Sequence, residues 1–213
     1  MTFQEDRWSS SFGASYTNRN PKSAWDMDIF YSQTYGITRT ELNYEFLDKT
    51  GMDDNARILE VGCGLGCQLA LLAEMGFRSL AGIDLQAHPG AGVAPGGILN
   101  LMQASALDIP FKSGFFDLVF TSGLLIHIAP KDLPRAMAEI HRCSRKWIWG
   151  LEYYSDELTD ILYRGERELL WKGPYARMYL EAFPDLELVH EKTLSYKAQT
   201  EAQDRMFLLR KKQ

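Results

Sequence analysis

A short glycine-rich segment is where residue types and spacing most clearly suggest chemistry. Gly62, Gly64 and Gly66 alternate with other residues directly after the apolar run RILEV at 57–61. Glycine tolerates positive φ angles and lets the backbone approach a ligand closely. Residues 68–75 (QLALLAEM) predict a helix, whose first turn offers unpaired N–H groups. The pattern predicts a cofactor-binding loop between a buried strand and a helix, rather than a turn that serves packing alone.

Two carboxylates frame this loop and indicate which cofactor it holds. Glu60 precedes Gly62 by two residues, and Asp84 lies in a second apolar run, LAGIDL, at 80–85. A carboxylate at Asp84 can accept hydrogen bonds from ribose hydroxyls, which suits NAD and S-adenosylmethionine alike. Glu60 would repel a pyrophosphate but attract the ammonium and sulfonium groups of S-adenosylmethionine. Glu60 therefore favours S-adenosylmethionine, whereas the glycines and Asp84 alone leave an NAD-type oxidoreductase open.

The elements that must position these residues alternate between strands and helices. Strands are predicted at 57–61, 80–85, 98–104, 116–121 and 147–152, and helices at 68–75 and 133–143. Such alternation implies parallel strands joined by right-handed crossovers. Two further strands, 186–194 and 205–210, predict an antiparallel hairpin at one edge. The expected fold is α/β: a Rossmann-like, doubly wound, seven-stranded sheet, mostly parallel, with a C-terminal antiparallel hairpin.

The chain is expected to form a single domain with three parts. These are an N-terminal helical cap or arm at 1–50, a cofactor-binding core at 51–152, and a substrate-side segment with the terminal hairpin at 153–213. A helix is expected over 165–183, with Pro174 near its first turn or at a break. The link at 86–97 holds four glycines and two prolines, so a loop is predicted there instead of a crossover helix.

Composition and charge limit the classes of function. The 213 residues carry a formal net charge of -5, which disfavours nucleic-acid binding, since such proteins are usually basic. No apolar run approaches the roughly 20 residues that span a bilayer, and no secretory signal is recognisable. Three cysteines without such a signal fit free thiols in the cytoplasm. Cys63 and Cys67 lack His or Cys partners at a suitable spacing, so no metal site is predicted.

The run ILEVGCGLG…LAGIDL…SALDIPFKSGFFDLVF resembles the class I S-adenosylmethionine-dependent methyltransferase family over residues 57–152. In that family the third strand ends in an acidic residue that binds the adenine amine, whereas this chain has Ser105 there. The resemblance implies adenine contacts through a hydroxyl or through backbone groups. Together with the loop, it implies cofactor contacts at Glu60, Gly62, Cys63, Gly64, Gly66, Asp84, Leu85, Ser105, Ala106, Leu107 and Thr121.

A closer resemblance, over nearly the whole chain, is to a small clade of methylases associated with pseudaminic acid biosynthesis. The segments that carry it are FGASYTNRNP (12–21), TSGLLIHIAPKDLPRAMAEI (121–140), LEYY (151–154), YRG (163–165) and LLWKGPYA (169–176). The resemblance implies methyl transfer to an amine or hydroxyl of a small polar acceptor, such as an amino sugar or a nucleotide sugar. A small-molecule natural-product methyltransferase unrelated to sugars is the alternative acceptor class.

Three residues are candidates for the catalytic step. His127 follows the fourth strand, and an imidazole that titrates near neutral pH suits a general base, although it can equally be a packed histidine at a helix start. Glu152 ends the fifth strand and can hold a substrate amine, act as base, or pair with an arginine such as Arg164. Tyr153 lines the acceptor pocket in this interpretation, or is an ordinary half-buried aromatic residue.

The N-terminal segment supplies two further candidates. Tyr16 and Arg19 are expected to cover the cofactor, with Arg19 paired to its carboxylate, unless both residues only pin the arm to the core. The serine at 105 and the missing crossover helix motivate a third function class, a catalytically silent protein that binds S-adenosylmethionine.

Overall fold

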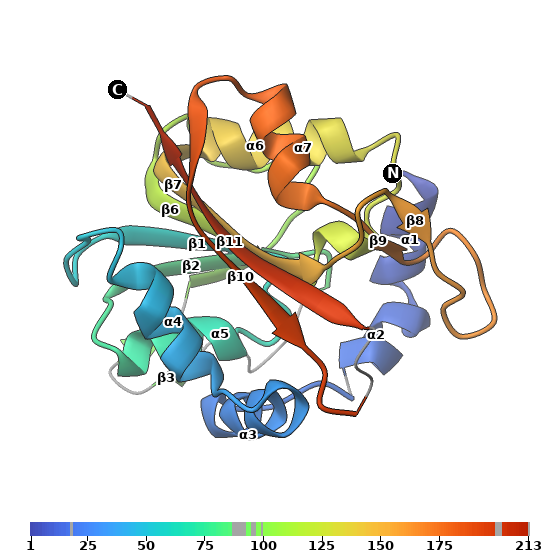
Figure 1. Cartoon of the computed structure of the whole chain (residues 1–213), viewed down its shortest axis with the longest axis horizontal. Helices are drawn as coiled ribbons and strands as arrows, with labels where there is room; N and C mark the ends of the chain where they lie inside the picture. The colour runs from blue at the N-terminus through green and yellow to red at the C-terminus, as the bar shows by residue number, and fades with distance from the viewer. Residues whose placement is uncertain (18, 87–92, 95–96, 99, 199–201, 213) are drawn as a thin grey trace.

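The computed structural model describes residues 1–213 except 18, 87–92, 95–96, 99, 199–201 and 213. Its centre is one seven-stranded sheet with the strand order β10-β11-β7-β6-β1-β2-β5 (Figure 1). The strands are Arg57–Val61 (β1), Ser79–Asp84 (β2), Asn100–Gln103 (β5), Phe116–Ser122 (β6), Ser144–Tyr153 (β7), Leu186–Ser195 (β10) and Gln203–Lys211 (β11). β5, β2, β1, β6 and β7 are parallel, and β11 is antiparallel to both β7 and β10. The predicted α/β fold, with its terminal hairpin, is confirmed.

Both faces of the sheet are buried, which explains why its strands read as continuous apolar runs. Successive side chains of a strand point to opposite faces. Leu118 and Phe120 of β6 accordingly pack in one core, whereas Val119 between them packs in the other. Helices α4 (Arg39–Leu47) and α5 (Cys67–Glu74) cover one face, and α6 (Leu133–Cys143) and α7 (Tyr175–Ala182) cover the other (Figure 1).

The prediction of a helix over 165–183 is wrong for the first half of this range. Helix α7 begins only at Tyr175, with Pro174 as its N-cap. The preceding residues instead form a small hairpin of β8 (Thr159–Asp160) and β9 (Trp171–Lys172). Arg164 and Glu168 have φ angles of 56° and 63°, and this left-handed conformation cannot continue an α-helix.

The predicted third strand is shorter than expected. β5 covers only Asn100–Gln103, because Gly97–Ile98 (β4) pairs with Val93–Ala94 (β3) in a separate two-stranded sheet. Most of the link predicted as a loop, 87–92 and 95–96, lies outside the described residues.

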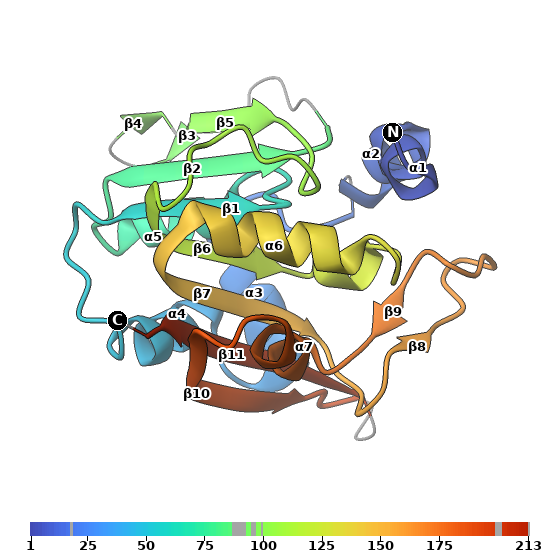
Figure 2. The same ribbon diagram turned by 90° about the horizontal axis from the view of Figure 1, so that it is seen from above.

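The N-terminal arm reaches the edge of the sheet where the parallel strands end. Helices α1 (Phe3–Ser9) and α2 (Ser11–Thr17) lie there, as does the β8–β9 hairpin (Figure 2). Arg7 of α1 forms an ion pair with Glu166 beside that hairpin. On the other side, Gln86 donates a hydrogen bond through Nε2 to the Trp8 carbonyl oxygen at 2.9 Å. The arm is thereby fixed over the carboxyl ends of the strands from two directions.

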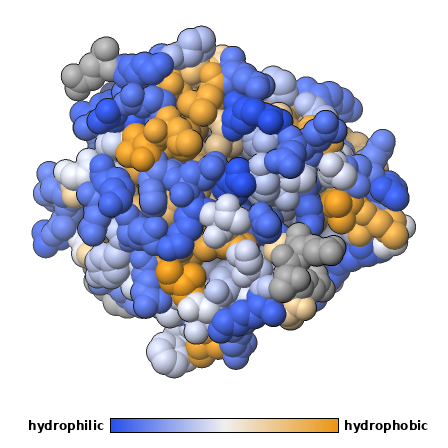
Figure 3. All heavy atoms as spheres, viewed as in Figure 1, coloured by the Kyte–Doolittle hydropathy of each residue, from blue (hydrophilic) through white to orange (hydrophobic). Residues whose placement is uncertain are grey.

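The outer surface is mainly hydrophilic on the face seen in Figure 3, where hydrophobic groups occur in separate small areas. Within the described residues, no helix combines the length and the apolar character needed to cross a membrane.

Candidate active site

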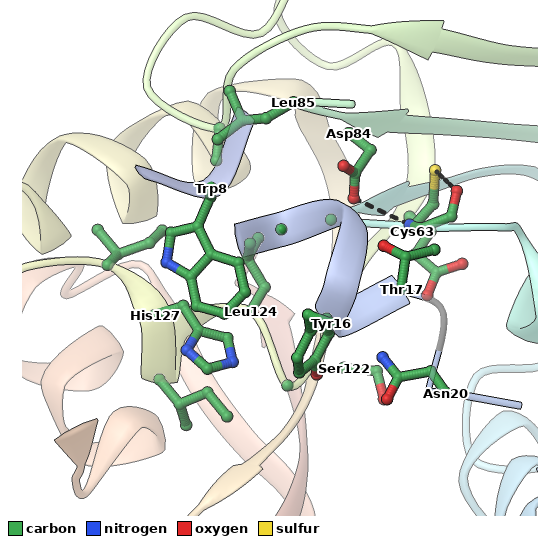
Figure 4. Close-up of a pocket in the computed structure, with 18 of the residues that line it drawn as sticks. Trp8, Tyr16, Thr17, Asn20, Cys63, Asp84, Leu85, Ser122, Leu124 and His127 are labelled. Carbon is green, nitrogen blue, oxygen red and sulfur yellow. Dashed lines mark hydrogen bonds between the residues drawn. The ribbon is translucent and has the colours of Figure 1, made fainter. Parts of the chain in front are cut away.

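A cavity of about 470 Å³ lies at the carboxyl ends of the parallel strands (Figure 4). The arm and α3 (Ala24–Tyr35) form one wall of this cavity. The glycine loop, the ends of β2 and β5, and the short 3-10 helix η1 (Leu125–His127) form the others. This is the position at which open α/β sheets bind ligands, since the strand order reverses between β1 and β6.

The glycine loop has the conformation that its residues predict. Gly62, Gly64 and Gly66 have φ angles of 77°, 50° and 78°. A Cβ added at Gly62 would lie 2.7 Å from Leu124 Cδ1, whereas one added at Gly64 would meet nothing within 4 Å. Gly62 therefore permits close packing against the segment after β6, and Gly64 leaves open space beside the cavity.

Two buried polar side chains beside this loop carry atoms without hydrogen-bond partners. Glu60 of β1 is 2% exposed and its Oε2 accepts no hydrogen bond; both amide atoms of Gln68, in the first turn of α5, also lack partners. Burial raises the pKa of Glu60 well above its ordinary value, although the nearby Arg39 guanidinium acts to lower it. Unpartnered buried polar groups are costly, so they indicate a ligand site. A carboxylate and an amide here fit the ammonium and carboxylate of S-adenosylmethionine.

Asp84, the last residue of β2, lines the next part of the cavity. Its carboxylate accepts hydrogen bonds from the Gly64 and Gln86 backbone N–H groups, both at 2.9 Å. These contacts fix the carboxylate against the glycine loop, and Leu85 beside it also lines the cavity. Asp84 is the residue that would hold the ribose of the cofactor.

Ser105, the residue expected to contact adenine, is already engaged. Its hydroxyl donates to Glu5 Oε1 at 2.5 Å and accepts from the Leu107 backbone N–H at 3.0 Å. Ser105, Ala106 and Leu107 all line the cavity, as does Glu5 from α1. The arm therefore brings a carboxylate to the position where the sequence offers only a serine.

His127 presents one free nitrogen in an aromatic enclosure. Its Nδ1 lies 2.9 Å from the Leu169 carbonyl oxygen and therefore carries the proton, while Nε2 is buried without a partner. The rings of Trp8 and Tyr16 lie 4.2 and 5.6 Å from the imidazole, centroid to centroid (Figure 4). Burial lowers the pKa of His127 to about 4. The imidazole is therefore neutral at physiological pH and a weaker base than the near-neutral imidazole expected from the sequence, while the Nε2 lone pair has no protein partner.

Glu152 lies behind the cavity wall and supports η1. It is 1% exposed and accepts backbone hydrogen bonds from Leu124 and Ile126 at 3.3 and 3.4 Å. Burial raises the pKa of Glu152 to about 7. The alternative role of Glu152, an ion pair with Arg164, is not found among the described residues. Glu152 borders a second, smaller cavity, whereas the neighbouring Tyr153 lines the main one.

A buried carboxylate that sequence reasoning missed lies at the other end of the main cavity. Asp204 of β11 is 2% exposed and accepts hydrogen bonds from the Tyr35 and Tyr196 hydroxyls, the latter at 3.1 and 3.2 Å. Burial raises the pKa of Asp204 to about 6. Because both tyrosines donate their protons to Asp204, this cluster offers only acceptor sites to a ligand.

The structure brings most of the predicted cofactor residues to one cavity. Those that line it are Tyr16, Arg19, Glu60, Gly62, Cys63, Gly64, Asp84, Leu85, Ser105, Ala106 and Leu107. The Arg19 guanidinium donates to Ser15 Oγ at 2.9 Å. Gly66 is the N-cap of α5 and Thr121 is buried beside Glu152, so these two do not line the cavity.

Among the cavity residues that were not predicted, four are central to the geometry described above: Glu5, Trp8, Gln68 and Asp204. Gln68 had a usable signal, because it is a polar residue in the first turn after the glycine loop. No local pattern marks the other three, whose roles depend on long-range contacts. Over the part of the chain that the structure describes, no three His, Cys, Asp or Glu side chains are grouped as a metal site.

Comparison with known proteins agrees with this geometry. Residues 59–146, from β1 to the start of β7, match the family model for a methyltransferase domain. The chain carries a methyltransferase domain. The enzyme is a methyltransferase that uses S-adenosylmethionine, and the matched segment contains the glycine loop, Asp84 and His127. No curated protein matches the sequence significantly.

Solved structures share the methyltransferase's fold at low sequence identity. One is the 1,6-didemethyltoxoflavin-N1-methyltransferase of Burkholderia thailandensis with S-adenosylhomocysteine bound (TM-score 0.71, 18% identity, 98% of this chain and 87% of that one). A second is the magnesium protoporphyrin IX methyltransferase of Synechocystis PCC 6803, also with S-adenosylhomocysteine bound (TM-score 0.68, 14% identity, 97% of this chain and 97% of that one). A third is the [4+2]-cyclase SpnF (TM-score 0.61, 16% identity, 81% of this chain and 80% of that one). Because this neighbour is named as a cyclase, the fold by itself does not define the reaction.

Proposed function

We propose that this methyltransferase methylates an amine or hydroxyl of a small polar acceptor, with an amino sugar as the leading acceptor class. The observation that carries the proposal is the unpartnered Nε2 of His127, which lies in the cavity wall next to the predicted cofactor site. A neutral imidazole in this position can accept the proton that an attacking amine or hydroxyl must lose.

When bound, S-adenosylmethionine supplies an electrophilic methyl group on a sulfonium. The protein's part is to align the acceptor and to receive its proton, and alignment alone can provide much of the rate. The Leu169 carbonyl oxygen fixes the tautomer of His127, so that Nε2 is the basic atom. Glu152 holds the backbone of η1 and thereby positions His127. Trp8 and Tyr16 pack on the imidazole and exclude water from it.

The charge of the cavity favours a neutral or cationic acceptor. Among the described lining residues, five are carboxylates (Glu5, Glu60, Asp84, Asp132, Asp204) and one is a guanidinium, Arg19. The pyrophosphate of a nucleotide sugar would meet this acidic lining unfavourably, whereas a free amino sugar would not. Asp204, with its two tyrosines, suits hydrogen-bond donors such as sugar hydroxyls or an ammonium.

A second candidate acceptor is a small aromatic natural product. Trp8, Tyr16 and Tyr163 surround His127, with the Tyr163 ring 5.9 Å from the imidazole. Such a lining can stack on a flat ring as well as on the apolar face of a sugar.

An acceptor screen with S-adenosylmethionine carrying a deuterated methyl group tests the proposal. The panel contains free amino sugars, their N-acetylated and nucleotide-linked forms, and nitrogen heterocycles, and products are read by mass spectrometry. We expect a labelled product from free amino sugars and none from the His127→Ala variant. Labelled product from heterocycles alone would favour the second candidate. Cofactor binding without any product would indicate a catalytically silent protein.

A further inference from the structure

The order of the strands predicts where each part of the cofactor lies. The unpartnered Glu60 and Gln68 belong to β1 and α5, Asp84 ends β2, and β5 is the next strand outward. An extended cofactor with its amino-acid part at Glu60 and its ribose at Asp84 places its base at the carboxyl end of β5. Leu85, Ser105, Ala106 and Leu107 line the cavity there.

An ionisable group of the N-terminal arm lies at this end of the cavity. Glu5 of α1 lines the cavity with a side chain that is 17% exposed. Its Oε1 accepts from the Ser105 hydroxyl at 2.5 Å, and its Oε2 accepts from the Thr2 backbone N–H at 2.6 Å. Burial acts to raise the pKa of Glu5, but the hydrogen bonds from Ser105 and Thr2 lower it below its ordinary value. Glu5 is therefore ionised at neutral pH.

The contacts of Ser105 determine what it can offer a ligand. Its single proton is donated to Glu5, and one of its lone pairs receives the Leu107 N–H. A carboxylate has about four acceptor sites, and the protein contacts given above use two of those on Glu5. Glu5 is thus the stronger acceptor at this end of the cavity, and Ser105 holds it in place.

We propose that the Glu5 carboxylate accepts a hydrogen bond from the 6-amino group of the cofactor's adenine. The N-terminal arm would then be part of the cofactor site, and Ser105 would position Glu5 rather than contact the base itself. Because Arg7 and Trp8 tie the same helix to the β8–β9 hairpin and to Gln86, base recognition and closure of the arm become one event. This inference rests on the cofactor and is independent of the acceptor class.

The test is a comparison of two ligands by isothermal titration calorimetry. S-adenosylhomocysteine carries the 6-amino group, and its 6-deamino purine analogue lacks only that group. A hydrogen bond to a charged partner predicts that the unmodified protein prefers S-adenosylhomocysteine by roughly 10- to 100-fold. Glu5→Gln should reduce this preference to a few-fold, because a neutral amide oxygen is a weaker acceptor.

Two further variants separate Glu5 from its surroundings. Ser105→Ala should keep most of the preference, since the Thr2 N–H still holds the carboxylate. Glu41→Gln is the matched control, because Glu41 closes the same type of capping box at α4 that Glu5 closes at α1. Glutamine also serves in such a box, so Glu5→Gln should leave α1 folded. Glu41→Gln should leave the preference unchanged.

A measurement on the unmodified protein guards against an unfolded arm in the variants. At equal saturation, S-adenosylhomocysteine should slow trypsin cleavage after Arg7 more than the purine analogue does. Equal protection by both ligands would overturn the proposal, as would equal affinity for both. It would also fail if Ser105→Ala abolished the preference while Glu5→Gln retained it. If neither ligand bound the unmodified protein, the cofactor assignment itself would be wrong.

Discussion

The cofactor half and the acceptor half of the cavity are built in different ways. The glycine loop, Glu60, Gln68 and Asp84 come from one continuous stretch of chain, β1 to β2. The acceptor half combines the arm, η1, the hairpin and β11, which are far apart in sequence. Binding of the cofactor's amino-acid and ribose parts is consequently a local property of the chain, whereas the proposed adenine contact of Glu5 and acceptor recognition depend on how distant segments pack.

The two halves also differ in how their polar groups are satisfied. In the cofactor half, Glu60 and Gln68 have buried atoms without protein partners. In the acceptor half, Asp204 is already bonded to two tyrosines, whereas Nε2 of His127, Nε1 of Trp8 and Oε1 of Gln4 are buried without partners. The buried carboxylate of the cofactor half therefore gains its missing hydrogen bonds when the ligand binds, while the buried carboxylate of the acceptor half is already bonded within the protein. Four substitutions test this contrast.

The largest effect is expected for His127→Ala, because it removes the proposed base of the acceptor half. Turnover with the acceptor found in the screen should fall by roughly 10²–10⁴-fold. The affinity for S-adenosylmethionine, measured by calorimetry, should change little. His141→Ala is the control, since His141 bonds Asp185 away from the cavity. Unchanged turnover in His127→Ala would make this histidine structural.

Glu60→Gln should act on the cofactor half instead. Loss of a charged partner predicts an affinity for S-adenosylmethionine weakened by roughly 10- to 100-fold. Calorimetry measures this directly, with Glu74→Gln as an exposed control at the end of α5. Wild-type affinity in Glu60→Gln would show that the unpartnered carboxylate does not face the cofactor.

Asp204→Asn should impair acceptor binding without affecting cofactor binding. The amide keeps the shape but loses the charge, so KM for the acceptor should rise by roughly tenfold. The affinity for S-adenosylmethionine should stay the same. A parallel loss of cofactor affinity would place Asp204 in the cofactor half and contradict the division.

The smallest effect concerns Glu152, which supports the acceptor half from behind. Its pKa is raised from 4.5 to about 7 when folded, so the native state binds a proton that the unfolded state has released. The contribution of Glu152 to stability should therefore fall as pH rises from 4.5 to about 7, with a slope of at most about 1.4 kcal/mol per pH unit. Asp204 adds to this slope up to its pKa of about 6. His127, whose pKa is lowered from 6.5 to about 4 in the folded state, contributes a rise in stability with pH between these two values.

Between pH 6 and about 7, the melting temperature of Glu152→Gln should fall less steeply with pH, or rise more steeply, than that of the unmodified protein. Glu157→Gln, at an exposed position, should keep the pH dependence of the unmodified protein. A slope unchanged by Glu152→Gln would mean that this carboxyl titrates normally.

Much of the sheet could be predicted from the sequence, because its strands are short apolar runs bounded by turn residues. Helix α6 occurs over the predicted residues 133–143, where apolar side chains recur at helical spacing. The expectation for 165–174 failed, since left-handed residues at Arg164 and Glu168 leave no periodicity signal. The role of Glu152 could not be found either, because its partners are backbone N–H groups brought near by tertiary packing.

The sequence by itself determined the fold class, the glycine loop and the identity of the methyl donor. These depend on neighbouring residues: glycines at positive φ, a carboxylate before them and another at the end of the next strand. Only the tertiary structure decided that Glu5 stands beside Ser105, that Asp204 faces the cavity, and that His127 keeps Nε2 free. Each of these depends on contacts between segments remote in sequence, whose pairing is specified by packing of the whole core.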